Sequence, residues 1–397
     1  MRRHDESDEE EEPSAFVEYV AKRSTILRRL SLLGFTEAAA RAAFESWLEN
    51  ERETWARYAK EWKSGPADST TVIASALKHM SWETWKNHAQ AALATRFNFE
   101  RMDEEKDSIT SKFHDLSDSY LFVEGYGSLM SMRVLLDACT QVKEIRLDIS
   151  DLISSGYYEE DSRVVEDARL NAPHQLDTLA PTVILGEGST DLLVLRLALT
   201  GMHPELVDYF SFFNHSELSV DGGANYLVKF IKAFAAARAP SRMLAIFDND
   251  AAGSQAYESA KRLKLPTNIL VTKLPDSEIA RTYPTIGPGG PVVMDVNGQA
   301  AGIELYLGRR ALSKGGKLIP VRWGGYNQAT STYQGEVEDK NAVLESFTRR
   351  IASLKRPAKI RAEYPDLAGV WQHIFNLVEE QAGSAYLRAA ERQRNDW

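Results

Sequence analysis

The fold is decided by Ile184-Leu-Gly-Glu-Gly-Ser-Thr-Asp191 and Ala245-Ile-Phe-Asp-Asn-Asp-Ala-Ala-Gly253. Each stretch begins as an apolar strand and ends in carboxylates followed by glycine. Around them, short apolar segments alternate with amphipathic segments, which is typical of a mostly parallel sheet covered by helices. In such sheets the ligand crevice lies beyond the carboxyl ends of the strands. The pattern therefore predicts that both carboxylate groups border one crevice.

This alternation sets the expected fold class. We predict a Rossmann-like α/β fold with flanking helices, a mainly helical N-terminal region and a small α+β C-terminal extension. The predicted strands lie at 182–185, 209–213, 243–247, 268–271 and 292–295. The predicted helices lie at 191–200, 225–237, 254–263, 302–312, 340–354 and 367–397. A basic strand-like stretch at 316–322 precedes a loop rich in Gly, Tyr, Gln and Thr at 323–335.

The first part of the chain shows helical periodicity from residue 14 to about residue 112. Gly34 is expected to end one helix and Thr36 to begin the next. A short strand is predicted at 145–149. The tryptophans of this region are expected to pack between helices rather than to stack on bases. They are Trp47, Trp55, Trp62, Trp82 and Trp85.

Composition limits the classes of protein that the chain can form. A length of 397 residues predicts two or three domains. A single cysteine, Cys139, excludes an internal disulfide and any zinc site built from several thiolates. No run approaches the roughly eighteen apolar residues of a spanning helix, and the first residues show no apolar stretch for secretion. We therefore expect a cytoplasmic protein that does not associate with membranes.

The net charge of −10 is unevenly distributed. The first twelve residues carry −5, and we predict an acidic disordered tail there. Between Arg309 and Arg361 the balance reverses to +8, which could bind nucleic-acid phosphates or could belong to solvated helix faces. The candidate nucleic-acid-binding residues are Arg309, Arg310, Lys314, Lys317 and Arg322.

The acidic residues suit a hard divalent cation. Asp248 and Asp250 lie two positions apart, so an extended chain directs both side chains to the same side. Magnesium or manganese prefers such oxygen ligands and retains several waters. Gly188 and Gly253 would let the backbone turn tightly and approach a phosphate. The two clusters together predict a metal site that acts on phosphodiesters.

The paired motif Glu-Gly-x-x-Asp and Asp-x-Asp-x-x-Gly, each after an apolar strand, resembles the Toprim domain. That domain is shared by topoisomerases, bacterial primases, recombination-repair proteins and the nucleases of the overcoming-lysogenization-defect group. The resemblance covers about 182–312 and implies a Toprim fold there. It implies Glu187 as the general acid or base and Asp248 and Asp250 as ligands of Mg²⁺ or Mn²⁺. Asp191 would hold the loop or an outer-sphere water.

Three further residues each have a weaker or divided interpretation. Nuclease-type Toprim domains resemble this chain in having a late carboxylate, which makes Glu304 a candidate third metal ligand. The same residue also fits an amphipathic helix whose apolar neighbours pack inward. Lys273 could neutralise a phosphate or cap the sheet, and Asp276 is a weaker metal candidate.

The acidic start and the stretches Leu33-Gly-Phe-Thr-Glu-Ala and Leu147-Asp-Ile-Ser-Asp-Leu152 also resemble HEPN/Toprim-associated bacterial proteins. HEPN ribonucleases carry an Arg followed a few residues later by His on a helix. Between Arg169 and His174, a proline argues against that helix. The other pair, Arg196 and His203, lies outside the N-terminal region. A HEPN ribonuclease is therefore the least favoured alternative.

Four regions follow from this interpretation. They are an acidic tail at 1–13, a helical HEPN/Toprim-associated region at 14–165, a Toprim catalytic domain at 181–312 and a basic, mostly helical extension at 313–397.

Water is the expected nucleophile. The chain is short for a topoisomerase, and one cysteine argues against the zinc module of a primase. We predict a Mg²⁺- or Mn²⁺-dependent nuclease that acts on DNA or RNA, with anti-phage defence suggested by analogy. Because Gly-x-x-x-x-Gly-Lys-Ser/Thr is absent from the sequence, any ATPase would be a separate partner. A non-cleaving scaffold that binds nucleic acid and such a partner is the alternative, and a homo-oligomer stays open.

Overall fold

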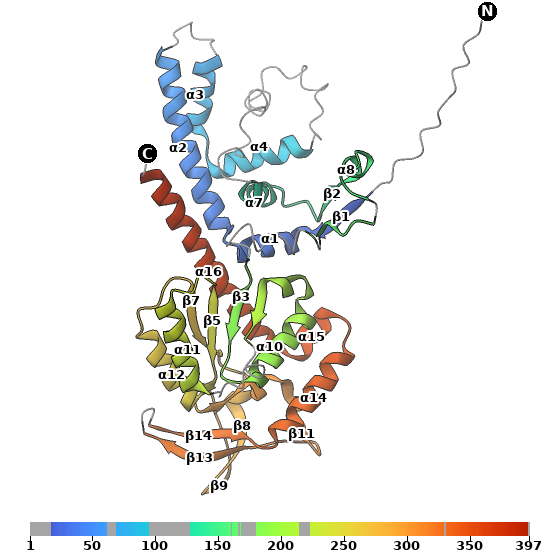
Figure 1. Ribbon diagram of the computed structural model, residues 1–397, viewed down its shortest axis with the longest axis vertical. Coiled ribbons are helices and arrows are strands. Elements are labelled where there is room, and N and C mark those ends of the chain that lie inside the picture. The colour runs from blue at the N-terminus through green and yellow to red at the C-terminus, as the bar shows by residue number, and fades with distance from the viewer. Residues whose placement is uncertain are drawn as a thin grey trace, which may run out of the picture. The chain divides into compact units, whose positions relative to one another are not determined.

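The structure is a computed structural model of the 397-residue chain. It describes residues 17–61, 69–94, 128–159, 161–165, 167, 180–213, 223–328 and 331–395. The chain divides into two compact units, Met1–Gln175 with Tyr386–Trp397, and Leu176–Ala385 (Figure 1). Some sequence predictions fall outside the described residues: the acidic tail at 1–13, Trp62, and the pair Arg169 and His174.

Helices dominate the described part of the first unit. They are α1 (Arg23–Leu32), α2 (Glu37–Glu61), α3 (Ser69–His79), α4 (Trp82–Ala94), α7 (Ser128–Ala138) and α8 (Ser150–Ser154). Gly34 follows α1 with a φ of +98°, a conformation that glycine adopts readily. At the start of α2, the Ala39 N–H donates to Thr36 Oγ1 at 3.1 Å. Both predicted helix boundaries are therefore confirmed.

The core of the first unit is built around aromatic side chains. Phe44 is fully buried, and its ring centroid lies 5.2 Å from that of Trp82 and 5.5 Å from that of Trp85. Trp47 and Trp55 pack against the same cluster. The predicted packing role is confirmed for these four tryptophans.

One strand of the first unit was predicted wrongly as helix. β1 (Glu18–Lys22) pairs antiparallel with β2 (Glu144–Asp148), with Glu18 opposite Asp148. The predicted strand at 145–149 is confirmed as β2. Because the partner of β1 lies far along the chain, local periodicity could not reveal the pairing.

A four-stranded parallel sheet forms the centre of the second unit, in the order β4-β3-β5-β7. Its strands are β3 (Thr182–Leu185), β4 (Phe210–Phe212), β5 (Met243–Phe247) and β7 (Ile269–Lys273). All four predicted core strands are present, and the architecture is consistent with an α/β fold. The strand order reverses between β3 and β5, which is where such sheets bind ligands.

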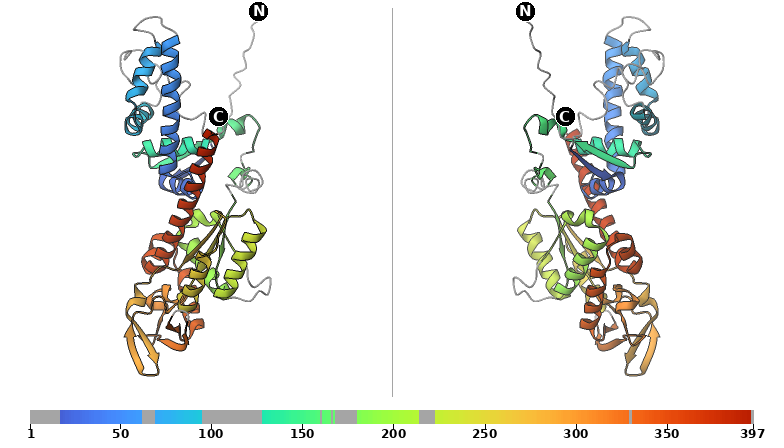
Figure 2. Two further views of the ribbon diagram at one scale, coloured as in Figure 1. Left: turned by 90° about the vertical axis from the view of Figure 1, so that its left-hand side faces the viewer. Right: turned by 90° about the vertical axis from the view of Figure 1, so that its right-hand side faces the viewer.

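Helices cover both faces of this sheet (Figure 2). α11 (Ala224–Ala237) and α12 (Ala251–Lys261) pack on the face that carries Ala245 and Phe247. Other helices of the unit are α10 (Ser189–Met202), α14 (Lys340–Ser353), α15 (Pro357–Glu363) and the part of α16 (Pro365–Asn395) that ends at Ala385. Trp371 Nε1 of α16 donates to the Leu195 carbonyl of α10 at 3.2 Å, joining these two helices.

A mixed sheet lies at the carboxyl ends of the parallel strands, in the order β14-β13-β8-β9 (Figure 1). Its strands are β8 (Tyr283–Gly287), β9 (Gly290–Met294), β13 (Val321–Asn327) and β14 (Thr332–Val337). The prediction of a loop at 323–335 is wrong, because most of this stretch forms the β13–β14 hairpin. Its glycines accommodate a bulge between Trp323 and Tyr326, and the ladder supplies the hydrogen bonds.

Two short strand pairs lie outside these two sheets. Strand β6 (Asn249–Asp250) pairs with β10 (Ala300–Ala301), and β11 (Ser313–Lys314) pairs with β12 (Lys317–Leu318). The helix predicted at 302–312 is interrupted into η5 (Ile303–Tyr306) and α13 (Gly308–Ala311), because Gly308 has a φ of +78°. Two other short helices of the described residues are η3 (Pro204–Tyr209) and η4 (Ile279–Thr282). None of the described helices could cross a membrane.

Candidate functional site

The two predicted carboxylate clusters meet where the strand order reverses. Glu187 follows β3, Asp248 follows β5, and the backbone N–H of Asp248 donates to Glu187 Oε1 at 2.9 Å. Gly253 permits this approach. A methyl group on Gly253 would overlap the Asp248 carbonyl oxygen and lie 2.7 Å from Glu187 Oε1. The glycine of the second motif is therefore required by close packing between the two clusters.

The first cluster is closed by Asp191, which lies in the first turn of α10. Its Oδ2 accepts a hydrogen bond of 2.8 Å from the Gly188 N–H. This bond holds the short loop that carries Glu187, and it places a third carboxylate beside the strand ends.

Asp250 occupies the start of α12. Its Oδ1 accepts from the Gly253 N–H at 2.7 Å, and its Oδ2 accepts from Gln334 Nε2 at 2.5 Å. The intervening Asn249 is fully buried and donates to Asp276 Oδ1 at 3.1 Å. Asp276 thus contacts the residue between the two aspartates, whereas Asp248 and Asp250 line a pocket.

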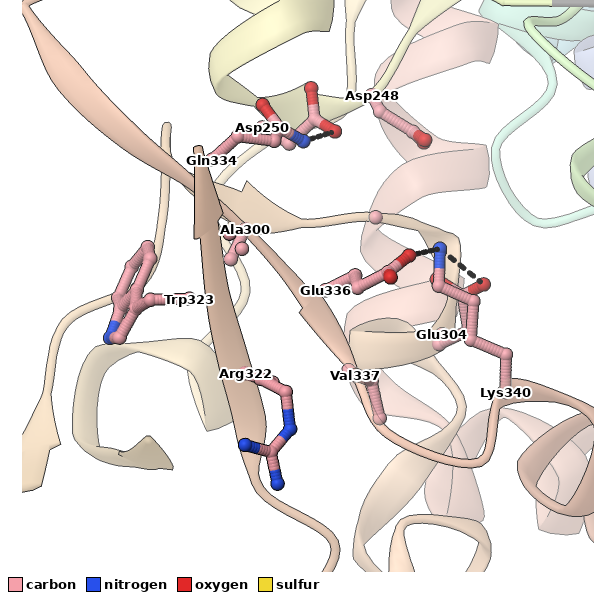
Figure 3. Close-up of a pocket in the computed structure, with 13 residues that line it drawn as sticks. Asp248, Asp250, Ala300, Glu304, Arg322, Trp323, Gln334, Glu336, Val337 and Lys340 are labelled. Carbon is pink, nitrogen blue, oxygen red and sulfur yellow. Dashed lines mark hydrogen bonds and ion pairs between the residues drawn. The ribbon is translucent and has the colours of Figure 1, made fainter. Parts of the chain in front are cut away.

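That pocket has a volume of about 330 Å³ (Figure 3). Asp248, Asp250, Glu336 and the buried Glu304 contribute its acidic lining. The β13–β14 hairpin and the start of α14 contribute most of the rest, including Arg322, Trp323, Gln334 and Lys340. Figure 3 shows Arg322 and Trp323 projecting in different directions from the hairpin. The pocket combines carboxylates, an amide and cationic groups.

Lys340 provides a positive charge beside the acids. Its Nζ lies 3.3 Å from Glu336 Oε2 and 3.7 Å from Glu304 Oε1 (Figure 3). Burial by itself lowers the pKa of Lys340, but the charges of Glu304 and Glu336 raise it overall. The Lys340 side chain is therefore positively charged at neutral pH.

Burial and mutual repulsion raise the pKa values of the carboxyl groups at the strand ends. Burial, with added repulsion from Asp250 and Asp191, raises the pKa of Glu187 to about 7. Burial and then the charge of Glu304 raise the pKa of Asp191 to about 7. Burial and the charges of Asp191 and Glu187 raise the pKa of Asp248 well above its ordinary value. Such a cluster needs protons or a cation to balance its charge.

The oxygen atoms at the pocket determine whether a divalent metal could bind there. Within the described ranges, no group of three or more His, Cys, Asp or Glu side chains could hold a metal ion. Mg²⁺ commonly uses only one or two carboxylates and completes its shell with water and substrate phosphate. A methyl group on Gly302 would lie 2.8 Å from Glu304 Oε2 and 3.5 Å from Asp248 Oδ2, so both oxygens border one small space. This oxygen pair fits the sparse protein ligation of Mg²⁺.

Other predicted site residues lie apart from this pair. Lys273 ends β7, and its Nζ donates to Ser254 Oγ at 3.4 Å. It is not among the described residues that line the pocket. The apolar neighbours of Glu304, Ile303 and Leu305, are buried, so Glu304 both lies within a packed short helix and reaches the pocket.

The predicted phosphate-binding cations occupy different settings. Arg309, Arg310 and Lys317 are exposed, on α13 and β12. Lys314 Nζ contacts Asp339 Oδ2 at 2.7 Å, and Arg322 forms an ion pair with Glu338. Some of the local positive charge is therefore balanced within the chain.

The remaining HEPN candidate does not form a shared exposed site. Arg196 is exposed on α10, whereas His203 is buried at the end of that helix. The His203 ring packs edge-on against Phe375, with centroids 5.1 Å apart. This environment is that of a packed core histidine.

Sequence reasoning missed Gln334, Lys340 and Trp323 as pocket residues. Gln334 and Trp323 fall in the stretch predicted as a loop, and Lys340 lies at a predicted helix start, directly after the acidic residues Glu338 and Asp339. The only signal was the unusual composition of 323–335. Nothing local indicated that these residues approach Asp250 and Glu304.

Comparisons with known proteins concern mainly the first unit. The search of curated proteins and the search of solved structures found no match. Residues 1–171 match the family model described as HEPN/Toprim N-terminal domain 1. This match suggests a nuclease-associated module and supports a HEPN/Toprim-associated protein.

Proposed function

We propose that the chain is a metal-dependent nuclease that hydrolyses phosphodiester bonds of DNA or RNA through a Toprim-type site. One observation carries the proposal: Glu187 and Asp248, 61 positions apart, are hydrogen-bonded where the strand order reverses. Asp250 and Glu304 join Asp248 at the same pocket. The motif resemblance and the family match of the N-terminal residues support the same activity.

The acidic lining would bind the metal. Asp248 and Glu304 are the proposed ligand pair for Mg²⁺ or Mn²⁺, and Asp250, which lines the same pocket, would join them as a ligand when the ion is bound. When bound, the ion would polarise the scissile phosphate and lower the pKa of an attacking water. Lys340 and Arg322 also line the pocket, and they would contact the phosphate oxygens in exchange for part of their ion pairs with Glu304, Glu336 and Glu338.

Glu187 is the proposed proton acceptor. Burial raises its pKa to about 7, which suits proton transfer near neutral pH. One of its oxygens accepts from the Asp248 N–H, leaving the other for the proton. Glu187 is not among the described pocket-lining residues, so a water would connect it to the reacting group.

The test uses the purified full chain with plasmid, linear DNA and RNA in Mg²⁺ or Mn²⁺. Glu187→Ala and Asp248→Ala should abolish cleavage, while Glu258→Ala, at an exposed position on α12, should retain it. Cleavage that survives both active-site substitutions contradicts the assignment. Tight nucleic-acid binding without cleavage by the wild type would instead support the scaffold alternative.

The biological setting is a separate proposal. A role in anti-phage defence and a separate ATPase partner rest on the resemblance to the overcoming-lysogenization-defect group. Adding such an ATPase to the cleavage assay tests the partner directly. An unchanged rate and unchanged substrate range would contradict a need for it.

A further inference from the structure

The carboxylate of Asp250 has two roles: it caps the start of α12 and it lines the pocket. As the residue before α12, it accepts from the Gly253 N–H through Oδ1 at 2.7 Å. It also lines the pocket beside Asp248. Rotation of the carboxylate would change both the helix cap and the oxygen offered to the pocket. Its orientation must therefore be held by a further contact.

Gln334 supplies that contact from the other side of the pocket. Its Nε2 donates to Asp250 Oδ2 at 2.5 Å (Figure 3), and its Oε1 accepts from the Ala252 N–H at 3.0 Å. One partner is an acceptor and the other a donor, so the two bonds define which end of the amide faces each. The side chain bridges Asp250 and the first turn of α12.

The strand that carries Gln334 is itself fixed against the Asp250 loop. The Gly335 N–H donates to the Gln299 carbonyl at 3.3 Å, and Thr332 Oγ1 donates to Gln299 Oε1 at 2.9 Å. A methyl group on Gly335 would lie 2.8 Å from Ala300 Cβ, in the strand that pairs with Asp250. Contacts on both sides of Gln334 therefore determine where its amide lies.

We infer that Gln334 is a positioning residue that orients Asp250 for metal binding. The inference rests on the proposed nuclease function and adds a residue that neither the motif nor the resemblance identifies. Partners that hydrogen-bond to metal ligands commonly contribute about 10- to 100-fold to metal affinity. Gln334 would act in this way through Asp250 Oδ2, without contacting the substrate.

Two substitutions separate positioning from simple packing. Gln334→Met keeps the length of the side chain but removes both hydrogen bonds, and Gln334→Ala removes the side chain beyond Cβ. Gln328→Met is the matched control, because Gln328 is exposed near the tip of the same hairpin. Thermal unfolding of each variant verifies that the chain remains folded.

The first measurement is amide hydrogen exchange in metal-free protein. Gln334→Met should accelerate exchange of the Ala252 amide, because its acceptor is lost, and Gln328→Met should leave it unchanged. The second is calorimetric titration with Mn²⁺, in which both Gln334 variants should bind about 10- to 100-fold more weakly than wild type.

The outcomes distinguish this inference from the proposed function. If wild type binds Mn²⁺ and Gln334→Met binds it equally or more tightly, Gln334 does not position Asp250 and only the inference fails. If the Ala252 amide exchanges at the same rate in Gln334→Met as in wild type, the inference is also overturned. If wild type neither binds Mn²⁺ nor cleaves nucleic acid, the proposed function fails and the inference fails with it.

Discussion

Glu187 Oε1 accepts a hydrogen bond of 2.9 Å from the backbone N–H of Asp248. This bond joins the ends of two adjacent parallel strands, β3 and β5. It brings the two acidic motifs into one site and occupies only one oxygen of Glu187. A structural role and a proton-transfer role can therefore be separated by substitution.

Glu187→Gln should fold like the wild type and lose cleavage by about 10²- to 10⁴-fold. The glutamine Oε1 can still accept from Asp248, but the amide cannot take up a proton at neutral pH. Glu187→Ala should lose cleavage and also stability, because the partly buried Asp248 N–H loses its acceptor. Plasmid cleavage rates and thermal unfolding measure the two effects. Full activity in Glu187→Gln would exclude proton transfer by this residue.

The glycines at the site should respond differently to alanine. In Gly253→Ala the new methyl overlaps the Asp248 backbone, so the free energy of unfolding should fall by about 1–3 kcal/mol. In Gly302→Ala it meets the Glu304 and Asp248 side-chain oxygens instead. We expect little loss of stability there but about tenfold weaker Mn²⁺ binding. Denaturant unfolding measures the stability of each variant, and calorimetry measures its affinity for Mn²⁺. Unchanged Mn²⁺ binding by Gly302→Ala would contradict Asp248 and Glu304 as the ligand pair.

The metal-free protein should show an unusual pH dependence. The pKa of Glu187 is raised to about 7 by burial, so the folded state retains a proton that the unfolded state releases at about pH 4. The contribution of Glu187 to the free energy of unfolding therefore falls as pH rises from about 4 to 7. Above about pH 7 the full destabilisation is present.

Glu187→Gln removes this titration and isolates its effect. In the presence of EDTA, the variant should gain stability relative to wild type between pH 5 and pH 8. The measurement is the thermal unfolding midpoint of both proteins across that range. A constant difference between the two proteins would show that Glu187 does not titrate there.

The short β11–β12 hairpin offers a matched pair of lysines. Lys317 is exposed, whereas Lys314 forms an ion pair with Asp339. If this region contacts backbone phosphates, Lys317→Ala should reduce the slope of log affinity against log salt by about one. Lys314→Ala should change it less, because Asp339 already balances that charge. Equal slopes in wild type and both variants would remove the hairpin from the binding surface.

Sequence patterns predicted the parallel sheet because its signals are local. Strands β3 and β5 are continuous apolar segments, and the acid after each strand needs only its own spacing to be recognised. The wrong predictions have long-range causes. β1 exists because β2 pairs with it, and the β13–β14 hairpin depends on cross-strand hydrogen bonds that glycine content does not reveal. The break at Gly308 depends on a positive φ within an otherwise helical pattern.

The sequence by itself determined the four core strands and placed Glu187, Asp248 and Asp250 directly after two of them. These features follow from the periodicity of short segments, which acts over a few residues. Only the tertiary structure decided that Glu304, Lys340 and Gln334 share the pocket with those aspartates. Their approach depends on the packing of β14 and α14 against the strand ends, and those contacts form between segments distant in the chain.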